Sequence, residues 1–472
     1  MKRICWLALM LGLSTVSLHA QALAHLEEDA YRSMAEWEEV EYLVLTWTQF
    51  IPTLREVVRI AREECKVLII CQDSGLVKAD LESHGVDLAG ISYLPQAFNS
   101  VWIRDYGPAT VYRLQDGQRM LVDWIYNRPR PLDDQLPQII AEHLGISLLD
   151  MQLAPNGLVH IGGNFLVDGA GLGLASNLIL EENAQRDSYS LQPRVESDID
   201  RLAVRYLGLK RFVKLPPLPY DVIDHLDMHM QFLNEETLLV GLYPPGKADG
   251  PQIEANLDFL LDQVPSVFGT PLRVIRIPMP AHQGQFPDSE GTPYLTYTNV
   301  VILNRSVLVP VYGLPSDSLA LGIIQDEMPG YQIHGVDCRE VIAAGGALHC
   351  ITRTIGINQP LRMLHQPLRD PVSSGFPIKL KAQIEHPEGV VQATIFYRLK
   401  GQEDFEAVPM LALDSIHQQW TGYLFADRGS GEVEYFIEAE STNGQRKRHP
   451  LTAPRGVWTF ALKPVPQLGM QE

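Results

Sequence analysis

The chain has 472 residues, of which 46% are hydrophobic and 20% are charged. This length predicts two or three domains at about 150 residues each, and the composition excludes a disordered protein. A formal charge of −19 argues against nucleic acid and anionic membrane surfaces as partners, and it suits a cationic substrate.

The first 24 residues have the pattern of a secretory signal peptide. Lys2 and Arg3 precede an apolar run over residues 4–18, and alanines follow at positions 20, 22 and 24. The alternative is a membrane anchor, but the run is shorter than the ~20 residues that span a bilayer. The sequence therefore predicts signal-peptide export to the periplasm or the medium, with no membrane span after cleavage.

From about residue 36 to residue 366, short apolar strands alternate with amphipathic helices, which predicts an α/β or α+β fold. Helices are expected at Thr53–Glu64, Asp134–Leu144 and Pro251–Leu261. Strands are expected at Tyr42–Trp47, Val67–Cys71, Leu121–Tyr126, Val159–Val167, Leu238–Leu242, Val274–Ile277, Val300–Leu303 and Val307–Val311. No internal repeat is literal enough to be recognised.

Beyond Leu368 the pattern changes to closely spaced strands with no helical period. Strands are expected at Phe376–Glu385, Val390–Leu399, Trp420–Phe425, Glu432–Glu440 and Val457–Leu462. Turn signals such as Asn443-Gly444 separate them. This pattern predicts an immunoglobulin-like β-sandwich over residues 369–472.

Four segments concentrate polar residues among glycines and aromatic residues. The first is Val101–Pro108, with Trp102, Arg104 and Asp105, and the second is His160–Phe165, with Gly162, Gly163 and Asn164. The third is Asp221–Gln231, with Asp224, His225, Asp227 and His229. The fourth is Gly345–Arg353, with His349 and Cys350. Taken singly, each has a structural explanation, such as a salt bridge, a tight turn or a small buried thiol.

Metal binding is an alternative for the third segment. In an extended chain, His225, Asp227 and His229 share one face, and histidine with aspartate can bind metals. The paired cysteines that often accompany zinc sites are absent from the sequence. We therefore expect no metal and no other cofactor.

Together, one cysteine, one histidine and two aspartates fit nucleophilic catalysis on a guanidinium group. Carboxylates bind this planar cation bidentately. Its central carbon is a poor electrophile and needs a thiolate, which the bound cation favours. A histidine can protonate the departing ammonia and then deprotonate a water molecule.

These segments resemble the motifs of the agmatine deiminase and Porphyromonas-type peptidylarginine deiminase family, within the guanidino-group-modifying (pentein) superfamily. The matching stretches are Ala35-Glu36-Trp37-Glu38, Trp102-x-Arg104-Asp105-x-Gly107-Pro108, Gly162-Gly163-Asn164, His225-x-Asp227, Tyr297-Thr298-Asn299 and Gly345-Gly346-Ala347-Leu348-His349-Cys350. The resemblance covers residues 31 to 366. It implies a five-bladed α/β propeller over residues 25–368, with the active site on the propeller axis.

By this resemblance, Cys350 attacks the guanidinium carbon, Asp105 and Asp227 hold its nitrogens, and His225 moves the protons. A covalent thiouronium intermediate is then hydrolysed to a ureido product. The other implied site residues are Asn299 beside the cysteine, Trp102 against the alkyl stem of the substrate, and Gly163 with Asn164 in support of the site. His349 is expected to point away from the site, because side chains alternate in an extended segment.

The expected substrate is a peptide with a C-terminal arginine, which would become citrulline. Arg128 and Arg130 are spaced by two between prolines and can clamp a carboxylate, a role that two arginines of this region have in the similar peptidylarginine deiminases. The alternative is a surface loop in which these arginines pair with Asp133 and Asp134. Export and the sandwich domain also favour a peptide.

Other substrates and another class of function stay open. Agmatine would give N-carbamoylputrescine, and free arginine would also satisfy the two-arginine clamp. A metal-dependent hydrolase is a further enzyme alternative. In the other class, a non-catalytic protein would bind cationic peptides, although binding alone gives no reason for a thiol beside His225 and two aspartates. The sequence leaves protein partners unknown.

Overall fold

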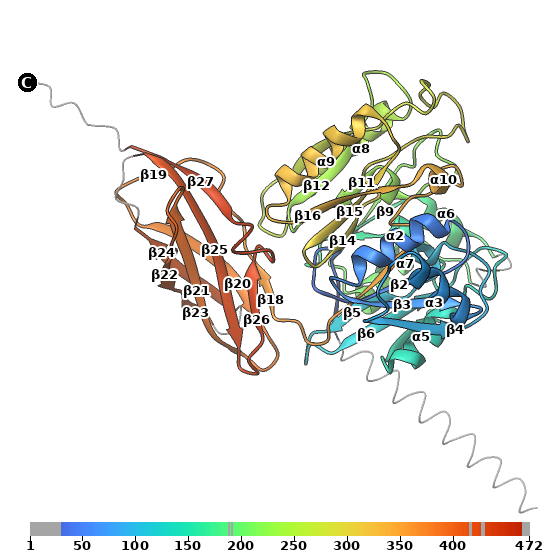
Figure 1. The fold of residues 1–472 in the computed structure, drawn as a ribbon, viewed down its shortest axis with the longest axis horizontal. Coiled ribbons are helices and arrows are strands. Elements are labelled where there is room, and N and C mark those ends of the chain that lie inside the picture. Colours follow the sequence, from blue (N-terminus) through green and yellow to red (C-terminus); the bar gives the residue numbers. More distant parts are fainter. Residues whose placement is uncertain (1–29, 187–188, 190–191, 415–417, 426–429, 465–472) are drawn as a thin grey trace, which may run out of the picture.

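The computed structural model describes residues 30–186, 189, 192–414, 418–425 and 430–464. The predicted signal peptide, residues 1–24, lies outside the described residues. The described chain forms a larger part with mixed helices and strands and a smaller part made of strands, which lie side by side (Figure 1). No helix in these ranges is long and apolar enough to cross a membrane.

The larger part contains five separate sheets of three or four strands. The first sheet contains β1 (Tyr31–Ser33), β5 (Ala109–Arg113), β6 (Arg119–Trp124) and β7 (Leu148–Met151), and the second contains β8 (Leu166–Val167), β9 (Leu172–Ser176) and β10 (Arg211–Leu215). The third contains β11 (Met230–Phe232), β12 (Thr237–Leu242) and β13 (Arg273–Pro278), and the fourth contains β14 (Val301–Leu303), β15 (Ser306–Val311) and β16 (Gln332–Asp337). The fifth contains β17 (Arg353–Gly356), β2 (Val40–Thr46), β3 (Lys66–Cys71) and β4 (Ile91–Pro95).

All five sheets share one plan. An antiparallel pair is followed by a third strand that lies parallel to the second member of that pair. In the fifth sheet, β17 from the end of this part pairs with β2 from its beginning, so the two ends of the larger part meet in one sheet. The repeat is therefore structural, although the sequence did not reveal it.

A helix covers each parallel crossover, because two parallel neighbours need a long connection. These helices are α2 (Ile51–Ala61), α3 (Ser74–Ser83), α5 (Leu136–Leu144), α6 (Leu178–Ala184), α7 (Glu196–Leu207), α8 (Gly250–Gln263) and α9 (Pro315–Glu327), with the short α4 (Ile103–Tyr106) and α10 (Arg339–Ile342) elsewhere. In α2 the predicted apolar stripe of Leu54, Val57, Val58 and Ala61 is fully buried. The three predicted helices are confirmed, with shifted ends.

Two predictions of extended chain are wrong. The strand expected over Val159–Val167 is interrupted by a 3-10 turn, η1 (Gly162–Asn164). The segment around His225 also turns, in η2 (Leu226–Met228), where the His229 N–H bonds the carbonyl of Leu226 at 3.0 Å. The predicted alternation across this segment therefore does not hold, because a turn rotates successive side chains differently from a strand.

Replacing Gly322 with alanine is expected to raise the free energy of unfolding by about 1 kcal/mol. Gly322 is exposed inside α9, and an added Cβ would meet no heavy atom within 4 Å. Alanine loses less backbone entropy than glycine when a helix forms. Urea denaturation of both proteins measures the difference, and an unchanged or lower midpoint would contradict the prediction.

The smaller part has two sheets around one hydrophobic core. One contains β18 (Arg362–Leu364), β20 (Ile378–Glu385), β24 (Gln419–Leu424) and β23 (Leu411–Asp414), and the other contains β19 (Val372–Ser373), β27 (Trp458–Lys463), β25 (Gly431–Ser441), β21 (Val390–Leu399), β22 (Glu406–Pro409) and β26 (Arg446–His449). All five strands predicted here are confirmed. β18 lies before the boundary predicted at residue 369 and already pairs with β20.

Candidate active site

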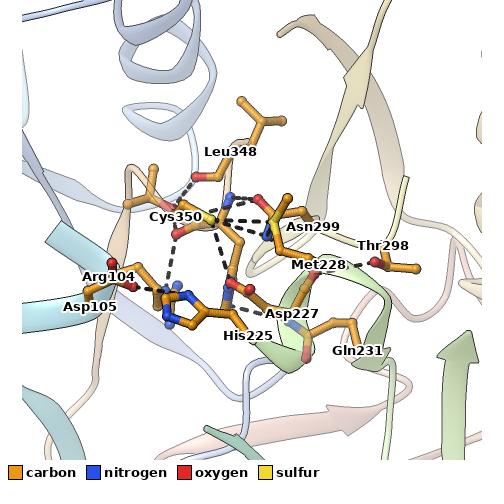
Figure 2. Close-up of polar contacts among 12 residues, drawn as sticks. Arg104, Asp105, His225, Asp227, Met228, Gln231, Thr298, Asn299, Leu348 and Cys350 are labelled. Atoms are coloured by element: carbon orange, nitrogen blue, oxygen red, sulfur yellow. Dashed lines mark hydrogen bonds and ion pairs between the residues drawn. The ribbon is translucent and has the colours of Figure 1, made fainter. Parts of the chain in front are cut away.

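The polar motifs lie at the same place in each of the five sheets. Each one immediately precedes the first strand of an antiparallel pair. Asp105 in α4 precedes β5, Asn164 in η1 precedes β8, His225 and Asp227 at η2 precede β11, Asn299 precedes β14, and Cys350 precedes β17. The repeated plan thereby brings together segments that are far apart in the sequence (Figure 2).

Cys350 is buried in a turn at the centre of this group. Asn299 Nδ2 lies 3.4 Å from its Sγ, and Asn299 Oδ1 accepts the His349 N–H at 2.9 Å. Asn299 therefore both contacts the sulfur and fixes the turn that carries it. Burial, followed by the carboxylates of Asp227 and Asp105, raises the pKa of Cys350 well above its usual value. A bound cation would offset these two carboxylates and favour the thiolate.

Asp105, Asp227 and His225 lie close together beside Cys350 and Gly163. Asp227 Oδ2 lies 3.7 Å from Cys350 Sγ, and Asp105 Oδ1 lies 3.7 Å from His225 Nδ1. The Oδ1 atoms of both aspartates and both ring nitrogens of His225 are buried without a hydrogen-bond partner among the described residues. Burial raises the pKa of Asp105, against the effect of His225. Such a concentration of unpartnered polar atoms is a property of binding sites.

Gly163 lets the side chains of Asp105, Asp227 and His225 approach its backbone closely. A Cβ added to Gly163 would lie 2.6 Å from His225 Nδ1, 3.1 Å from Asp105 Oδ1 and 3.3 Å from Asp227 Oδ1. Gly163 is not among the residues with positive φ, so glycine is required here for room and not for backbone conformation. The motif predicted that Gly163 supports the site, and only the folded chain relates this glycine to His225 and the two aspartates.

Two other predicted site residues have different surroundings. Trp102 lies against Gly346, where an added Cβ would be 2.5 Å from the Trp102 ring and 3.1 Å from Cys350 Sγ. Its ring therefore adjoins the nucleophile candidate. Asn164 is buried, and its Oδ1 accepts the Ser176 N–H at 2.7 Å. Asn164 thus joins η1 to β9 and braces the turn that carries Gly163.

The prediction that His349 points away from the site is wrong. Leu348–Ile351 form a turn instead of an extended strand, and His349 Nδ1 lies 2.7 Å from Asp227 Oδ2. Glu36, from the first motif, lies with its Oε1 3.3 Å from His349 Nε2 and accepts a hydrogen bond from Arg104 Nη1 at 2.7 Å. The sequence carried Glu36 in a quoted motif, but only the folded chain relates it to His349.

Arg128 and Arg130 lie within electrostatic reach of Asp105, whose pKa they lower against the larger effect of burial. Arg128 Nη1 is 3.2 Å from Glu182 Oε1, and Arg130 Nη1 donates to the Tyr126 hydroxyl at 2.9 Å. Among the described residues no side-chain hydrogen bond or ion pair joins either arginine to Asp133 or Asp134, although Arg130 lowers the pKa of Asp133 against the larger effect of burial. Asp133 accepts hydrogen bonds from Asn99, Ser100 and the Ser100 hydroxyl, and Asp134 accepts one from the Tyr126 N–H. No sequence motif marked Glu182.

Asp221, the first residue of the third motif, is a further buried carboxylate close to His225. It is 5% exposed, and its Oδ1 accepts the Ile223 N–H at 3.0 Å. Burial, with a smaller contribution from Asp224, raises the pKa of Asp221 to about 6 against the effect of His225. Within the described ranges, no group of three or more histidine, cysteine, aspartate and glutamate side chains is arranged to hold a metal ion.

Comparisons with known proteins identify the family and the relatives of this chain. The sequence profile of the Porphyromonas-type peptidyl-arginine deiminase family matches residues 32–355. A relative from Vibrio parahaemolyticus, named "Putative agmatine deiminase", is 24% identical over 376 residues, which cover 70% of this chain and 97% of the relative.

Solved structures show the same fold. The agmatine deiminase of Enterococcus faecalis has a TM-score of 0.58 at 21% identity, over 69% of this chain and 96% of that one. A C. jejuni agmatine deiminase with substrate bound has a TM-score of 0.57 at 19% identity, over 70% and 97%. The larger part is thus a mixed α/β fold like that of known deiminases. With the family profile matched over most of its length, the chain belongs to the Porphyromonas-type peptidyl-arginine deiminase family.

Proposed function

We propose that this protein hydrolyses the guanidinium group of a small guanidine such as agmatine, with Cys350 as nucleophile. The observation that carries the proposal is the cluster of buried polar atoms beside Gly163, where the Oδ1 atoms of Asp105 and Asp227 and both ring nitrogens of His225 have no partner among the described residues and lie next to Cys350. A planar cation with N–H donors satisfies both carboxylates at once.

The reaction follows from this arrangement. The Cys350 thiolate attacks the guanidinium carbon while Asp105 and Asp227 hold the nitrogens. The C–N bond breaks, and one nitrogen leaves as ammonia after His225 supplies its proton. A water molecule, deprotonated by His225, then attacks the thiouronium carbon. The C–S bond breaks, the ureido product leaves, and the thiol is restored.

Agmatine is supported over a peptide by two observations. The relative from Vibrio parahaemolyticus and the solved structures from C. jejuni and Enterococcus faecalis carry agmatine deiminase names, whereas two other solved neighbours are named as a putative arginine deiminase and a putative peptidyl-arginine deiminase. In addition, Asp221 supplies a buried carboxylate near His225, and the far end of agmatine is an ammonium group. A carboxylate that is poorly solvated gains most from a cationic partner.

Asp221 gives this proposal a pH test. Because its pKa is raised to about 6, Asp221 is charged above that pH and neutral below it. The KM for agmatine is therefore expected to rise as the pH falls through 6, whereas butylguanidine, which lacks the ammonium group, shows no such rise. Asp221→Asn should raise the KM for agmatine by at least about tenfold and remove its pH dependence. Equal pH profiles for both substrates would contradict this role.

A C-terminal arginine is the second candidate substrate, favoured by Arg128 and Arg130 near Asp105. Arg128 already faces Glu182, so Arg130 is the better partner for an incoming carboxylate. Arg130→Ala is expected to reduce the preference for a peptide ending in arginine over its amide by about tenfold, and to leave agmatine turnover unchanged. An equal fall in the turnover of the peptide and of its amide would argue against binding of the terminal carboxylate by Arg130.

The first experiment is ureido-product formation by the purified protein with agmatine, free arginine, the peptide and its amide, with Cys350→Ala as blank. Preference for agmatine supports the main proposal, and preference for the free-carboxylate peptide supports the second candidate. Turnover that survives a chelator argues against a metal-dependent hydrolase. No product from any substrate would favour a non-catalytic binding protein.

The domain architecture and the export of the protein are part of the same proposal. We propose that the five sheets are the blades of an α/β propeller, within the catalytic domain predicted over residues 25–368, except that β18 already pairs with β20 and so belongs to the smaller part. Residues 369–472 would form an immunoglobulin-like domain, and residues 1–24 would direct export. The shared sheet plan and the two-sheet core support the two domain assignments. N-terminal sequencing of the mature protein tests cleavage.

A further inference from the structure

His349 is completely buried between groups from several parts of the chain. Its Nδ1 lies 2.7 Å from Asp227 Oδ2. Its Nε2 lies 3.3 Å from Glu36 Oε1 and 3.4 Å from Gln231 Nε2. One ring nitrogen therefore faces the substrate-binding aspartate, and the other faces both a carboxylate and an amide.

The Gln231 amide has a defined orientation. Its Oε1 accepts the Phe232 N–H at 3.0 Å, which directs its Nε2, a donor, toward His349 Nε2. A neutral His349 can accept that N–H at Nε2 and carry its own hydrogen on Nδ1. A protonated His349 carries hydrogen on both nitrogens and can donate from Nε2 to Glu36. In both states Nδ1 donates to Asp227.

The surroundings of His349 are also fixed. Arg104 donates from Nη1 to Glu36 Oε1 at 2.7 Å and from Nε to the His349 carbonyl at 3.1 Å. Burial would raise the pKa of Glu36, but Arg104, His349 and Arg353 together hold it below its usual value. Glu36 thus stays a charged carboxylate next to the imidazole of His349. Arg104 anchors both this carboxylate and the backbone of His349.

We propose that His349 is a positioning residue that holds Asp227 by its Oδ2, so that Oδ1 faces the guanidinium-binding space. The alternative partners of Nε2, Gln231 and Glu36, keep this hold in both protonation states of the imidazole. Asp227 Oδ1 is the atom left without a partner beside Gly163, as this role requires. The inference rests on the proposed function of Asp227 as a ligand of the cation.

Two conservative variants test the roles of the two ring nitrogens of His349 separately. In His349→Asn, the amide nitrogen takes the place of Nδ1 and can still donate to Asp227. In His349→Gln, the amide nitrogen reaches the place of Nε2 and leaves Asp227 without its donor. We expect His349→Asn to keep kcat/KM within about tenfold of the wild type, and His349→Gln to lose about 10- to 100-fold. Equal losses in both would overturn the proposal.

A second measurement reports on Asp227 without turnover. Alkylation of Cys350 is followed with chloroacetamidine, which is cationic, and with the neutral chloroacetamide. The ratio of the two rates measures how well the carboxylates hold a cation. The ratio should stay high in His349→Asn and fall at least about tenfold in His349→Gln, because a misdirected carboxylate no longer pairs with the amidinium. An unchanged ratio in His349→Gln would refute the positioning role.

The ratio also separates this inference from the proposed function. If the wild type prefers chloroacetamidine but turns over no guanidine, the enzymatic proposal fails and the positioning of Asp227 stands. If the wild type shows no preference, cation binding itself fails. His365→Asn is the matched control, because His365 is equally buried but bonds the Lys381 carbonyl and the Tyr435 hydroxyl in the smaller part. It should leave the ratio unchanged.

The variant Gln231→Leu tests the exchange of partners between the neutral and the protonated imidazole of His349. Without the amide donor, a neutral His349 can turn its single hydrogen toward Glu36 and leave Nδ1 bare against Asp227. The groups that face the imidazole or Glu36 are Asp227, Glu36, Gln231, Arg104 and Arg353. The alkylation ratio of Gln231→Leu is expected to match the wild type at low pH and to fall as the pH rises. A ratio that is lowered equally at all pH values would contradict the exchange of partners.

Discussion

Cys350→Ala is expected to reduce ureido-product formation by roughly 10⁴-fold or more, because no other group can form the covalent intermediate. The sulfur is held by Asn299 next to Asp227, in a turn whose backbone is also fixed by Asn299. Alanine removes the sulfur without adding bulk, so the carboxylates and His225 keep their places. Binding of agmatine should therefore persist, and calorimetry on the variant measures it.

Cys338→Ala is the matched control for this loss. Cys338 is also a buried free thiol, at the beginning of α10. Its replacement removes the same atom from a part of the core that does not line the site, so turnover should stay within a few-fold of the wild type. Wild-type activity in Cys350→Ala would rule out covalent catalysis by this cysteine.

Gly163→Ala is expected to lower kcat by at least about 100-fold while the protein still folds. The added methyl group would lie 2.6 Å from His225 Nδ1, a distance that forces the imidazole to move. It would also occupy the space between Asp105 and Asp227 where the guanidinium is proposed to lie. An ångström of displacement is enough to cost this much, because proton transfer and attack both depend on the position of the reacting groups.

Thermal melts and circular dichroism should separate this local effect from unfolding. Gly163 has no positive φ, so alanine fits its backbone, and Gly322→Ala serves as the control for adding one methyl group. Gly162→Ala offers the contrast, because its Cβ would lie 2.0 Å from the Arg104 carbonyl oxygen and should destabilise the fold itself. Full activity in Gly163→Ala would place the guanidinium somewhere else.

Local patterns predicted some of the regular elements, but they missed α7, although it buries Ile199, Leu202, Ala203, Tyr206 and Leu207 at a helical spacing. The strand at Val390–Leu399 was predicted with the bounds that the structure has, and α2 was predicted from its apolar stripe. The helix α9 was missed because it buries only Ala320 and Ile324, which leaves too narrow a stripe. The turns at η1 and η2 were read as strands, because apolar residues that pack against a turn look the same in sequence as those of a strand.

The amino-acid sequence predicts the chemical groups of the site and the family, because a thiol, an imidazole and two carboxylates in a set order of motifs have few other uses. It did not determine their convergence. Only the repeated sheet plan does so, by placing each motif just before the first strand of a unit. The direction of His349 and the contacts of Gly163 with His225 and the two aspartates are likewise tertiary. Each depends on contacts between segments far apart in the chain, and such contacts leave no periodic trace in the sequence around them.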